Sequence, residues 1–552
     1  MRAKPPRPKG DANGFSPEAI WAAGLFAILC ICLQAWRSEV LQSSYDQGIF
    51  QQVLWSTLHG HPFESTLSSQ LSTNVIHNGE LPSVGYQRLG QHFTPALLLW
   101  VPLFGMLGGA ALPIIQVGLI TLSGLILNKI SRDMLPERTS NWITYGYFFS
   151  TALIGPTLGN FTDLSQLPIA FFLLVFGLQK RKPWLIISTT IFIPLIREDT
   201  GVLLVGIGAW LILRYRNHWR IAIAISLYGI LWMLLTTSVL MPIFSDDNSK
   251  RFMVENFGQY LQPSQGEGVS SIVMLRQIVT SPILILKELF DPPLQTLLYL
   301  LAHALPFLFI PLICLDTWIL AGPSLLGLFL AQGSNDPLSI TIRYTLLVVP
   351  GFSIGTILWW SNQRMKSPSK RMRNAWRICL ALALILTLSS NPNRSLSFLI
   401  PDSFEPWVYS SPIEQWKHGK AARKVLELIP AKASVSATTH LVPLLAQREV
   451  VVRYPNSSAY VARDGTTQPV EWIAVDLDWL KRYSTAFPRD WRKLKNIQKK
   501  LVGKVGQYQT QAIHDGVVVL QLNGPEKPEL NAFLQDLLRA SLPSDPKLQK
   551  EP

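Results

Sequence analysis

The sequence has few cysteines and few charged residues. Its 4 cysteines among 552 residues, Cys30, Cys32, Cys314 and Cys379, all fall within apolar runs, and the long polar segments have none. Neither a disulfide framework nor a cysteine-based zinc site is therefore indicated. Charged residues make up only 15% of the chain against 48% hydrophobic residues, and the mean hydropathy is +0.23. A soluble chain of this length would need more polar surface, so the apolar residues must meet lipid.

The sequence also lacks an internal repeat of fixed period, which excludes a solenoid. Long apolar runs recur instead from Ala19 to Ser389. Each is close to the roughly 20 residues that cross ~30 Å of hydrocarbon, whereas a soluble core helix would show one polar face. We therefore predict about eleven transmembrane helices. They lie near residues 19–36, 96–127, 142–159, 164–179, 183–196, 201–213, 219–241, 294–313, 317–331, 343–361 and 375–389.

The formal net charge of +14 would suit a nucleic-acid-binding protein, but the positions of the charges indicate a membrane topology. Many Lys and Arg residues lie in the N-terminal tail and in the segments 129–138, 180–182, 214–220 and 364–377, between apolar runs. These segments alternate with loops poor in Lys and Arg, and cytoplasmic loops of membrane proteins are enriched in both residues. We predict a cytoplasmic N-terminus, an extracytoplasmic C-terminus, the lipid bilayer as a partner, and no nucleic acid.

The predicted fold is an all-α polytopic transmembrane bundle with a small α/β C-terminal extracytoplasmic domain. Residues 1–18 form a cytoplasmic basic tail, and 19–389 form the transmembrane module with large outside loops at about 37–95 and 242–293. Within the second loop, the apolar spacing of 272–290 predicts a helix on the membrane surface. The segment 390–540 contains an amphipathic helix at 416–428 and strands at 433–435, 449–454, 472–477 and 516–522. The tail 541–552 is predicted to be disordered.

Asp46 is the candidate catalytic residue of the first outside loop. It follows the first apolar run closely, next to Tyr45, and precedes a stretch with an apolar helical face that includes Ile49 and Val53. This pattern predicts a helix lying along the membrane. Asp is a favoured helix N-cap, which is one interpretation of Asp46. The other is a general base that accepts a proton from an acceptor hydroxyl.

Four of the nine histidines, His59, His61, His77 and His92, also lie in this loop. A metal site must be considered, although the spacing is not diagnostic and loop histidines are usually solvated. His92 is the strongest functional candidate because it stands just before the next apolar run. No cofactor is firmly indicated. If a divalent cation binds, Asp46, His92 and Glu198 are its candidate ligands.

Charged residues that border apolar runs are costly to bury and are functional candidates by default. Arg197, Glu198 and Asp199 interrupt one run, Asp163 lies between two others, and Arg343 begins a late one. The topology places all of them on the outside, where Arg197 could hold a phosphate. The alternative for the triplet is a short charged turn. The substrate- or phosphate-binding candidates are Tyr45, Arg88, His92, Asp163, Arg197, Glu198, Asp199 and Arg343. His303, inside a run, is at least as well explained as a packing histidine.

Several of these motifs resemble a known family. They are Tyr45-Asp46-Gln47-Gly48-Ile49-Phe50-Gln51-Gln52, His59-Gly60 with Phe63-Glu64-Ser65, Gly90-Gln91-His92-Phe93-Thr94-Pro95, Arg197-Glu198-Asp199-Thr200-Gly201, and the stretch from Ile429 to Pro455. The ensemble is similar to the bacterial and archaeal membrane family catalogued as domain of unknown function 2079, over most of the chain. The chain departs from the expected pattern where Gln47 follows Asp46 in place of a second acid, and where Asn160-Phe161-Thr162-Asp163 stands in place of the family's His-Pro pair.

That family is grouped with the GT-C membrane glycosyltransferases, and the resemblance implies a sugar donor carried on polyprenyl phosphate and an acidic residue of the first outside loop at the reaction centre. Asp46 matches that position. The expected protein is a multi-pass enzyme of the bacterial plasma (inner) membrane that transfers the sugar, with inversion, to an extracytoplasmic glycan, lipid or protein acceptor. The alternatives are a transporter or flippase of a lipid-linked or small polar substrate, and an inactive family member that acts as a binding protein.

Overall fold

The computed structural model describes residues 14–247, 251, 253–261, 271–331, 338–363, 367–504 and 506–539. The chain divides into two compact units. The first, here called the helical unit, comprises Met1–Cys32, Leu89–Leu97 and Pro113–Pro392. The second, called the mixed unit, comprises Leu33–Arg88, Leu98–Leu112 and Asn393–Pro552. Residues 1–13 of the predicted basic tail and the predicted disordered tail 541–552 lie outside the described residues.

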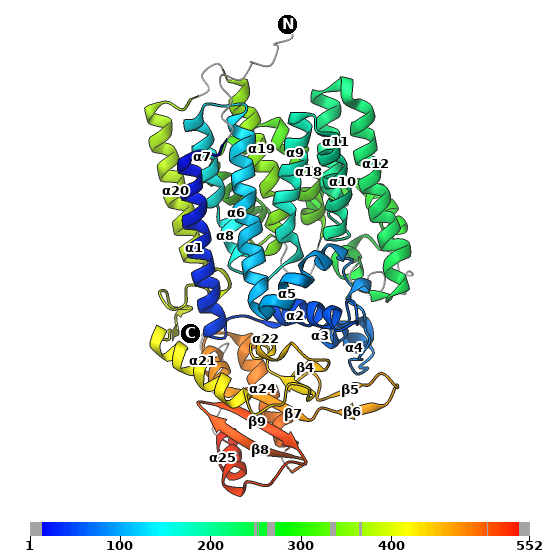
Figure 1. Ribbon diagram of the computed structural model, residues 1–552, viewed down its shortest axis with the longest axis vertical. Coiled ribbons are helices and arrows are strands. Elements are labelled where there is room, and N and C mark those ends of the chain that lie inside the picture. The colour runs from blue at the N-terminus through cyan, green and yellow to red at the C-terminus, as the bar shows by residue number, and fades with distance from the viewer. Residues whose placement is uncertain are drawn as a thin grey trace. The chain divides into compact units, whose positions relative to one another are not determined.

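The helical unit is a bundle of apolar helices (Figure 1). α11 (Gly201–Arg214) packs against α12 (Trp219–Leu235) and α18 (Leu315–Leu330), while α9 (Leu167–Lys180) packs against α10 (Pro183–Ile196). The other helices of the bundle are α6 (Ala111–Arg132), α7 (Glu137–Phe148), α8 (Thr151–Thr157), α16 (Pro293–Ala304), α17 (Ile310–Ile313), α19 (Val349–Asn362) and α20 (Lys370–Ser390). α1 (Pro17–Glu39) and α6 contribute residues to both units.

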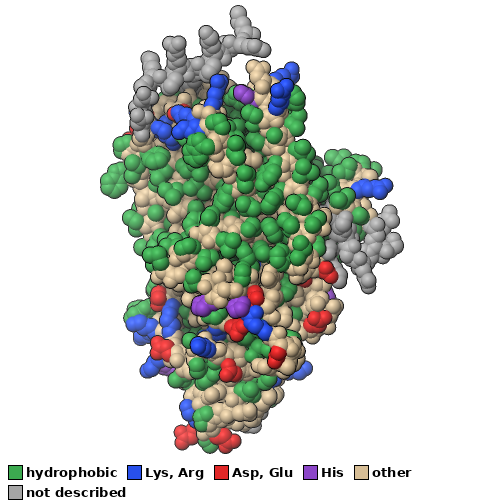
Figure 2. Space-filling view, turned by 45° about the vertical axis from the view of Figure 1, so that its right-hand side comes forward, with side chains coloured by type: hydrophobic (Ala, Val, Ile, Leu, Met, Phe, Trp, Pro, Cys, Tyr) green, Lys and Arg blue, Asp and Glu red, His purple; other side chains and the backbone are tan. Residues whose placement is uncertain are grey.

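Within the described residues, five helical segments are long and apolar enough to cross a membrane: Pro17–Glu39, Pro95–Arg132, Arg216–Ile243, Arg343–Asn362 and Lys370–Ser390. Three shorter apolar helices, α10, α11 and α18, add to them. On the face shown in Figure 2, hydrophobic side chains cover much of the surface of the helices, as a lipid-facing surface requires. The number of spans, about eleven, and the orientation stay predictions.

Small residues bring these helices close together. A Cβ atom added to Gly206 on α11 would lie 2.5 Å from the carbonyl oxygen of Leu320 on α18. Such close backbone approach is how membrane helices gain van der Waals contact, because lipid supplies no hydrophobic driving force between them. The charged triplet lies in the connection between α10 and α11. This connection therefore leads into a helix, α11, that is tightly packed against α18.

The prediction of one continuous helix at 272–290 is wrong. The structure has two helices here, α14 (Ser271–Thr280) and α15 (Pro282–Glu288), separated at Ser281. Pro282 explains the break, because proline disfavours the helical conformation of the residue before it. Upstream of them lies the short helix α13 (Met253–Phe257).

The mixed unit contains a five-stranded sheet in the order β4-β3-β7-β9-β8 (Figure 1). β4 (Val451–Arg453), β3 (Val435–Ala437) and β7 (Trp472–Asp476) are parallel, whereas β9 (Val517–Leu522) runs antiparallel to both β7 and β8 (Tyr508–His514). Two hairpins accompany the sheet: β1 (Ser403–Phe404) with β2 (Trp407–Val408), and β5 (Ala459–Val461) with β6 (Thr467–Pro469). Three predicted strands are confirmed as β4, β7 and β9, whereas the strand predicted at 433–435 shares only Val435 with β3. β8 was not predicted.

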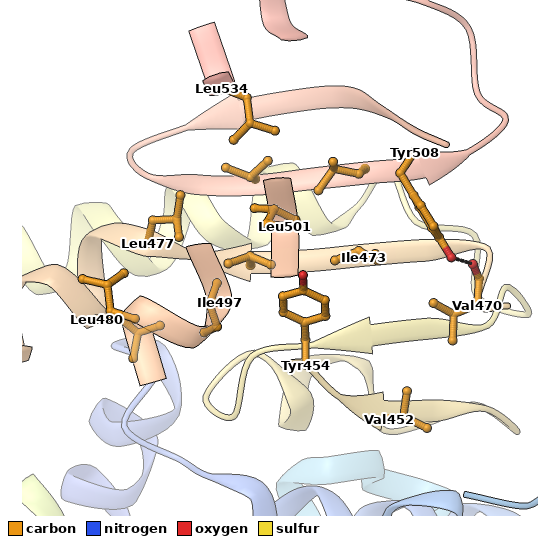
Figure 3. Packing of buried hydrophobic residues seen from close by; sticks show 14 residues of the cluster. Val452, Tyr454, Val470, Ile473, Leu477, Leu480, Ile497, Leu501, Tyr508 and Leu534 are labelled. Carbon is orange, nitrogen blue, oxygen red and sulfur yellow. Dashed lines mark hydrogen bonds between the residues drawn. The ribbon is translucent and has the colours of Figure 1, made fainter. Parts of the chain in front are cut away.

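One hydrophobic core stabilises the C-terminal part of the mixed unit (Figure 3). Ile473 and Leu520 of the sheet pack with Ile497 and Leu501 of α24 (Pro488–Val502), all at most 2% exposed. The Tyr508 hydroxyl donates a hydrogen bond of 2.6 Å to the Val470 carbonyl, which satisfies this buried polar group. The remaining helices are α21 (Pro412–Leu426), α22 (Val442–Leu445), α23 (Leu477–Ser484) and α25 (Pro528–Arg539).

The first loop also belongs mainly to the mixed unit. Its helix α2 (Tyr45–Leu58) is joined by α3 (Thr66–Ser69), α4 (Thr73–His77) and α5 (Val101–Leu107). The expectation of a single apolar face on α2 is wrong, because polar residues such as Gln47, Gln51 and Gln52 are buried together with Ile49 and Val53. Contacts with α3, α5 and α22 surround the helix. α2 is thus a core element of its unit.

Candidate functional site

The connection between α10 and α11 positions three charged side chains. α10 ends at Ile196, Arg197 has an extended backbone, and α11 begins at Gly201. The hydroxyl of Thr200 closes the turn by donating to the carbonyls of Ile193 (2.6 Å) and Arg197 (2.8 Å). Arg197 is only 3% exposed, so its guanidinium is held between helices rather than in solvent. The alternative of a solvated charged turn does not describe this side chain.

Asp199 provides the counter-charge for Arg197. The guanidinium donates from Nε to Oδ1 at 2.7 Å and from Nη2 to Oδ2 at 2.5 Å, a bidentate geometry that is the strongest form of this ion pair. Burial alone would lower the pKa of Arg197, but Asp199 raises that pKa well above its ordinary value. Burial would likewise raise the pKa of Asp199, yet Arg197 lowers it overall. Both groups are therefore charged at neutral pH.

Glu198 pairs with His92. The His92 Nδ1 and Glu198 Oε1 atoms are 2.8 Å apart, and Glu198 Oε2 accepts a hydrogen bond of 2.9 Å from the backbone N–H of Phe93. Burial, and then the charge of Asp199, raise the pKa of Glu198 to about 7. A carboxyl group with a pKa near neutrality can gain or lose a proton during a reaction at that pH. The pair is suited to hold and move a proton.

Asp163, Arg343 and Tyr344 complete the group. The guanidinium carbon of Arg197 lies 5.4 Å from the centroid of the Tyr344 ring, and that of Arg343 lies 5.5 Å from the same centroid. Asp163, at the start of η4 (Asp163–Gln166), is buried and interacts electrostatically with Arg197. Its Oδ1 accepts from the Leu164 N–H, whereas Oδ2 has no hydrogen-bond partner among the described residues.

Six residues predicted from the sequence thus meet within the helical unit: His92, Asp163, Arg197, Glu198, Asp199 and Arg343. We call them, with Tyr344, the Arg197 cluster. Its two guanidinium groups face three carboxyl groups, so its charge is balanced only when one acid is protonated or His92 is charged. Within the described residues, Nη1 of Arg197 makes no hydrogen bond. The cluster therefore offers a cationic donor and a nearby proton for an anion.

The other predicted residues lie in the mixed unit. Asp46 is the second residue of α2 and the N-cap is Ser44, so the N-cap interpretation of Asp46 is wrong. The Tyr45 hydroxyl donates to the Leu67 carbonyl at 2.5 Å, and Arg88 is buried with its guanidinium 4.6 Å from the Phe50 ring centroid. The predicted binding roles of Tyr45 and Arg88 stay predictions. So does the convergence of Asp46 with the Arg197 cluster, because it joins the two units.

The loop histidines do not form one cluster. Among the described residues, no group of three or more His, Cys, Asp or Glu side chains is placed to hold a metal ion. His59 stacks on Trp55 at 4.2 Å between ring centroids, His61 lies 3.7 Å from Glu64, and His92 pairs with Glu198. The divalent cation stays a prediction. His303 is buried beneath Tyr299, with its Nδ1 2.9 Å from the Tyr299 carbonyl oxygen, as a packing histidine would be.

A second buried ionic group in the mixed unit was not predicted. Asp476 Oδ2 lies 2.8 Å from His418 Nε2 and 2.9 Å from His440 Nε2, and His418 Nδ1 lies 2.8 Å from Asp515. Burial alone would lower the pKa of His418, but Asp476 and Asp515 raise it to about 9. Asp476 ends a strand that the sequence identified, and its carboxylate also caps α23 through the Trp479 N–H. In the sequence, only the acid at the end of this strand pointed to the group. Nothing there indicated that His418 and His440 are its partners.

These observations define a membrane protein with a charged cluster at the ends of apolar helices and a separate α/β unit. The family model described as "Predicted membrane protein (DUF2079)" matches residues 37–519. The chain belongs to that family, as the resemblance of its motifs indicated.

Two solved structures resemble the chain over most of its length. The crystal structure of ArnT from Cupriavidus metallidurans bound to undecaprenyl phosphate is 11% identical, covers 91% of this chain and 98% of that chain, and has a TM-score of 0.46. The archaeal oligosaccharyltransferase AglB from Archaeoglobus fulgidus, in complex with an inhibitory peptide and a dolichol-phosphate, is 10% identical. It covers 92% of this chain and 75% of that chain, with a TM-score of 0.40. No curated protein matches the sequence.

Proposed function

We propose that this protein is a GT-C-type membrane glycosyltransferase that moves a sugar from a polyprenyl-phosphate carrier to an extracytoplasmic acceptor with inversion. Family membership and the motif resemblance support the reaction class. The observation that carries the proposal is the Arg197 cluster, a buried guanidinium beside a second guanidinium and a carboxyl group with a pKa of about 7.

The Arg197 cluster would hold the phosphate of the donor. Asp199 engages Nε and Nη2 of Arg197 and orients the guanidinium, while Nη1 remains for a phosphate oxygen. Arg343 shares the Tyr344 ring with Arg197 and adds the second positive charge. Cations fixed in advance in a poorly hydrated site stabilise charge that develops on a leaving group, because they need no reorganisation during the reaction.

Asp46 would act as the general base. An acceptor oxygen forms a bond to the anomeric carbon of the sugar while the bond from that carbon to the phosphate oxygen breaks. The proton of the acceptor hydroxyl goes to the Asp46 carboxylate, and the polyprenyl phosphate leaves with the electron pair of the broken bond. One displacement from the opposite face inverts the anomeric centre, and a positioned base of this kind typically contributes about 10²–10⁴ in rate.

Glu198 would adjust the charge of the site to its ligand. With Glu198 ionised, the three carboxylates of the cluster repel a phosphate. Because its pKa is about 7, Glu198 can take up a proton when the phosphate arrives. His92, at 2.8 Å, is the neighbour that can share this proton. With Glu198 protonated, two guanidinium groups face two carboxylates. This charge favours binding of the phosphate and leaves the Arg197–Asp199 ion pair intact.

A transporter or flippase is the first alternative, since it would also need ionisable groups among apolar helices. Transporter sites usually form at mid-depth between repeated halves and on interrupted helices. Here Arg197 follows the end of α10, Asp163 begins η4, and Arg343 begins η11 (Arg343–Leu347). Positions at helix ends suit both functions, but the sequence has no repeated halves, which favours the transferase. An inactive binding protein is the second alternative, suggested by Gln47 after Asp46.

The test uses the full chain, purified and reconstituted in liposomes with radiolabelled polyprenyl-phosphate sugars and a membrane acceptor fraction. The variants are Arg343→Gln and a matched control, Arg214→Gln. Arg214 ends α11, at the end of the helix away from Arg197. Like Arg197, it forms a bidentate ion pair, here with Asp316 at 2.6 and 2.9 Å. We expect wild type and control to transfer label, and Arg343→Gln to lose roughly 10²-fold or more.

Three results would overturn the proposal. An equal loss of sugar transfer in both variants would show that the substitutions disturb folding rather than phosphate binding. Movement of labelled lipid across the bilayer without transfer would identify a transporter. Saturable binding of polyprenyl phosphate by wild type, with no transfer to any acceptor, would identify the inactive binding protein.

A further inference from the structure

The mixed unit carries large apolar side chains that its core does not use. In the segment 399–416, Phe404 is 72% exposed, Trp407 63% and Leu399 63%. Phe404 and Trp407 face each other across the β1–β2 hairpin, with ring centroids 6.0 Å apart in an edge-to-face arrangement. Exposed apolar side chains that lie together, as these two rings do, mark an interaction surface with a protein or a membrane. We call residues 399–408, which contain β1 and β2, the aromatic hairpin.

Contacts inside the mixed unit join the aromatic hairpin to the end of α1. Phe398 lies 5.7 Å from Trp36 of α1 between ring centroids, and its carbonyl accepts a hydrogen bond of 3.1 Å from the Tyr409 hydroxyl, just past β2. Tyr409 in turn stands 6.2 Å from the Trp407 ring. The hairpin is therefore fixed next to the last turns of α1 through Phe398, which Tyr409 ties to the end of β2.

α21, which follows the hairpin, is also attached to the end of α1. Arg423 donates hydrogen bonds to the backbone carbonyls of Ser38 (2.6 Å) and Glu39 (2.8 Å) and forms an ion pair with the Glu39 side chain at 3.2 Å. An arginine on the last carbonyls of a helix satisfies acceptors that the helix leaves open and complements its dipole. The register between α1 and the segment from Phe398 to Arg423 is thus well defined.

The length of α1 determines where the aromatic hairpin lies along the bilayer normal. α1 has 23 residues and is a candidate membrane span. At about 1.5 Å per residue it is about 35 Å long, slightly more than the ~30 Å of hydrocarbon. Its end at Glu39 consequently falls at the bilayer surface. Trp and Tyr side chains concentrate at that level in membrane proteins, because their rings suit the boundary between headgroups and acyl chains.

We infer that the aromatic hairpin is a membrane-interface anchor that inserts Leu399, Phe404 and Trp407 into the lipid headgroup region beside α1. Trp416 on α21 continues the surface: it is 41% exposed, and the Lys420 ammonium lies 3.7 Å from its ring centroid. A lysine can lay its stem on apolar surface while its charge stays in water. Such insertion reaches about 5–10 Å into the boundary between the headgroups and the acyl chains. The anchor would hold the α/β part of the mixed unit at the bilayer surface.

The test measures the depth of single labelled positions. The full chain, with its four native cysteines replaced, receives one cysteine as Phe404→Cys or Leu399→Cys and is labelled with an environment-sensitive fluorophore in phosphatidylcholine nanodiscs. Phe533→Cys on α25, 55% exposed in the same unit, is the matched control. We expect the first two labels to show blue-shifted emission and quenching by lipid that carries a spin label near the headgroup, and the control to show neither.

Water-like emission at Phe404 and Leu399, or quenching equal to that of the control, would overturn the inference. A disulfide-linked dimer formed through Phe404→Cys within nanodiscs that hold two copies would also overturn it, since a second copy of the chain would then cover the hairpin. The labelled positions are exposed, so the labels themselves do not disturb the core. Sugar-donor binding by the cysteine-free chain shows that replacing the buried Cys30, Cys314 and Cys379 leaves it folded.

Discussion

Replacement of Asp476 by asparagine should destabilise the mixed unit in a pH-dependent manner. Asp476 is fully buried, and its carboxylate meets His418 and His440 at 2.8 and 2.9 Å. Asparagine keeps the size and one acceptor but removes the charge. Breaking a buried ion pair on one side typically costs about 3–5 kcal/mol, because the partner remains buried without compensation. We expect a loss of about 4 kcal/mol, which is roughly three powers of ten in an equilibrium constant.

The pH dependence follows from the signs of two shifts. The pKa of His418 is raised in the folded state, from 6.5 to about 9, so its contribution is full below about pH 6.5 and is lost as the pH rises through about 9. That shift corresponds to about 3 kcal/mol. The pKa of Asp476 lies well below its usual range, because its histidine partners outweigh the effect of burial; its contribution is present above about pH 4 and is lost in strong acid. The difference between wild type and variant should therefore shrink above pH 9.

Hydrogen exchange of the full chain in nanodiscs, read on peptides that cover β7 and α23, measures this difference. The matched control is Asp478→Asn on α23, the helix that Asp476 caps; the Asp478 carboxylate is 39% exposed and pairs with Arg482 at 2.9 Å. An exposed pair of this kind is worth at most about 0.5 kcal/mol. Equal loss of protection in the two variants, or a loss in Asp476→Asn that stays constant up to pH 10, would refute the ionic account of this group.

Two further predictions concern the helical unit. Wild type should bind a polyprenyl-phosphate sugar, a phosphodiester whose own charge is constant over this range, roughly tenfold more weakly at about pH 8 than at about pH 6, because Glu198 ionises between them, and Glu198→Gln should remove this dependence. Titration calorimetry at both pH values checks it, and an unchanged dependence in the variant would assign the titration to another group. Gly206→Leu should lower the thermal unfolding temperature in detergent, because its side chain would meet the Leu320 carbonyl of α18. Gly118→Leu, with open space around its Cβ, is the control, and equal effects would contradict the packing argument.

The sequence predicted those parts of the fold and of the site that depend on patterns within one short segment. Apolar runs located the membrane helices, and β-branched residues located β7 and β9. Arg197, Asp163 and Arg343 stood out because each borders an apolar run, where a charge is costly unless it is paired. Their meeting in one cluster followed from assigning them to the same side of the membrane.

The parts that were missed depend on contacts between distant segments. The histidine partners of Asp476 lie 36 and 58 residues away from it in the sequence. The burial of most of α2 depends partly on α22, almost 400 residues further along the chain, so its own spacing indicated only one apolar face. β8 was missed because Gln509 and Gln511 weaken its hydrophobic pattern.

The most direct test of the proposed function is sugar transfer by the full chain with Asp46→Asn, measured with radiolabelled polyprenyl-phosphate sugar in liposomes. Binding of the donor is measured in parallel, so that a folding defect would be recognised. If Asp46 is the general base, the variant binds the donor as wild type does, and transfer falls by at least about 10²-fold. Transfer at the wild-type rate by Asp46→Asn would contradict the account.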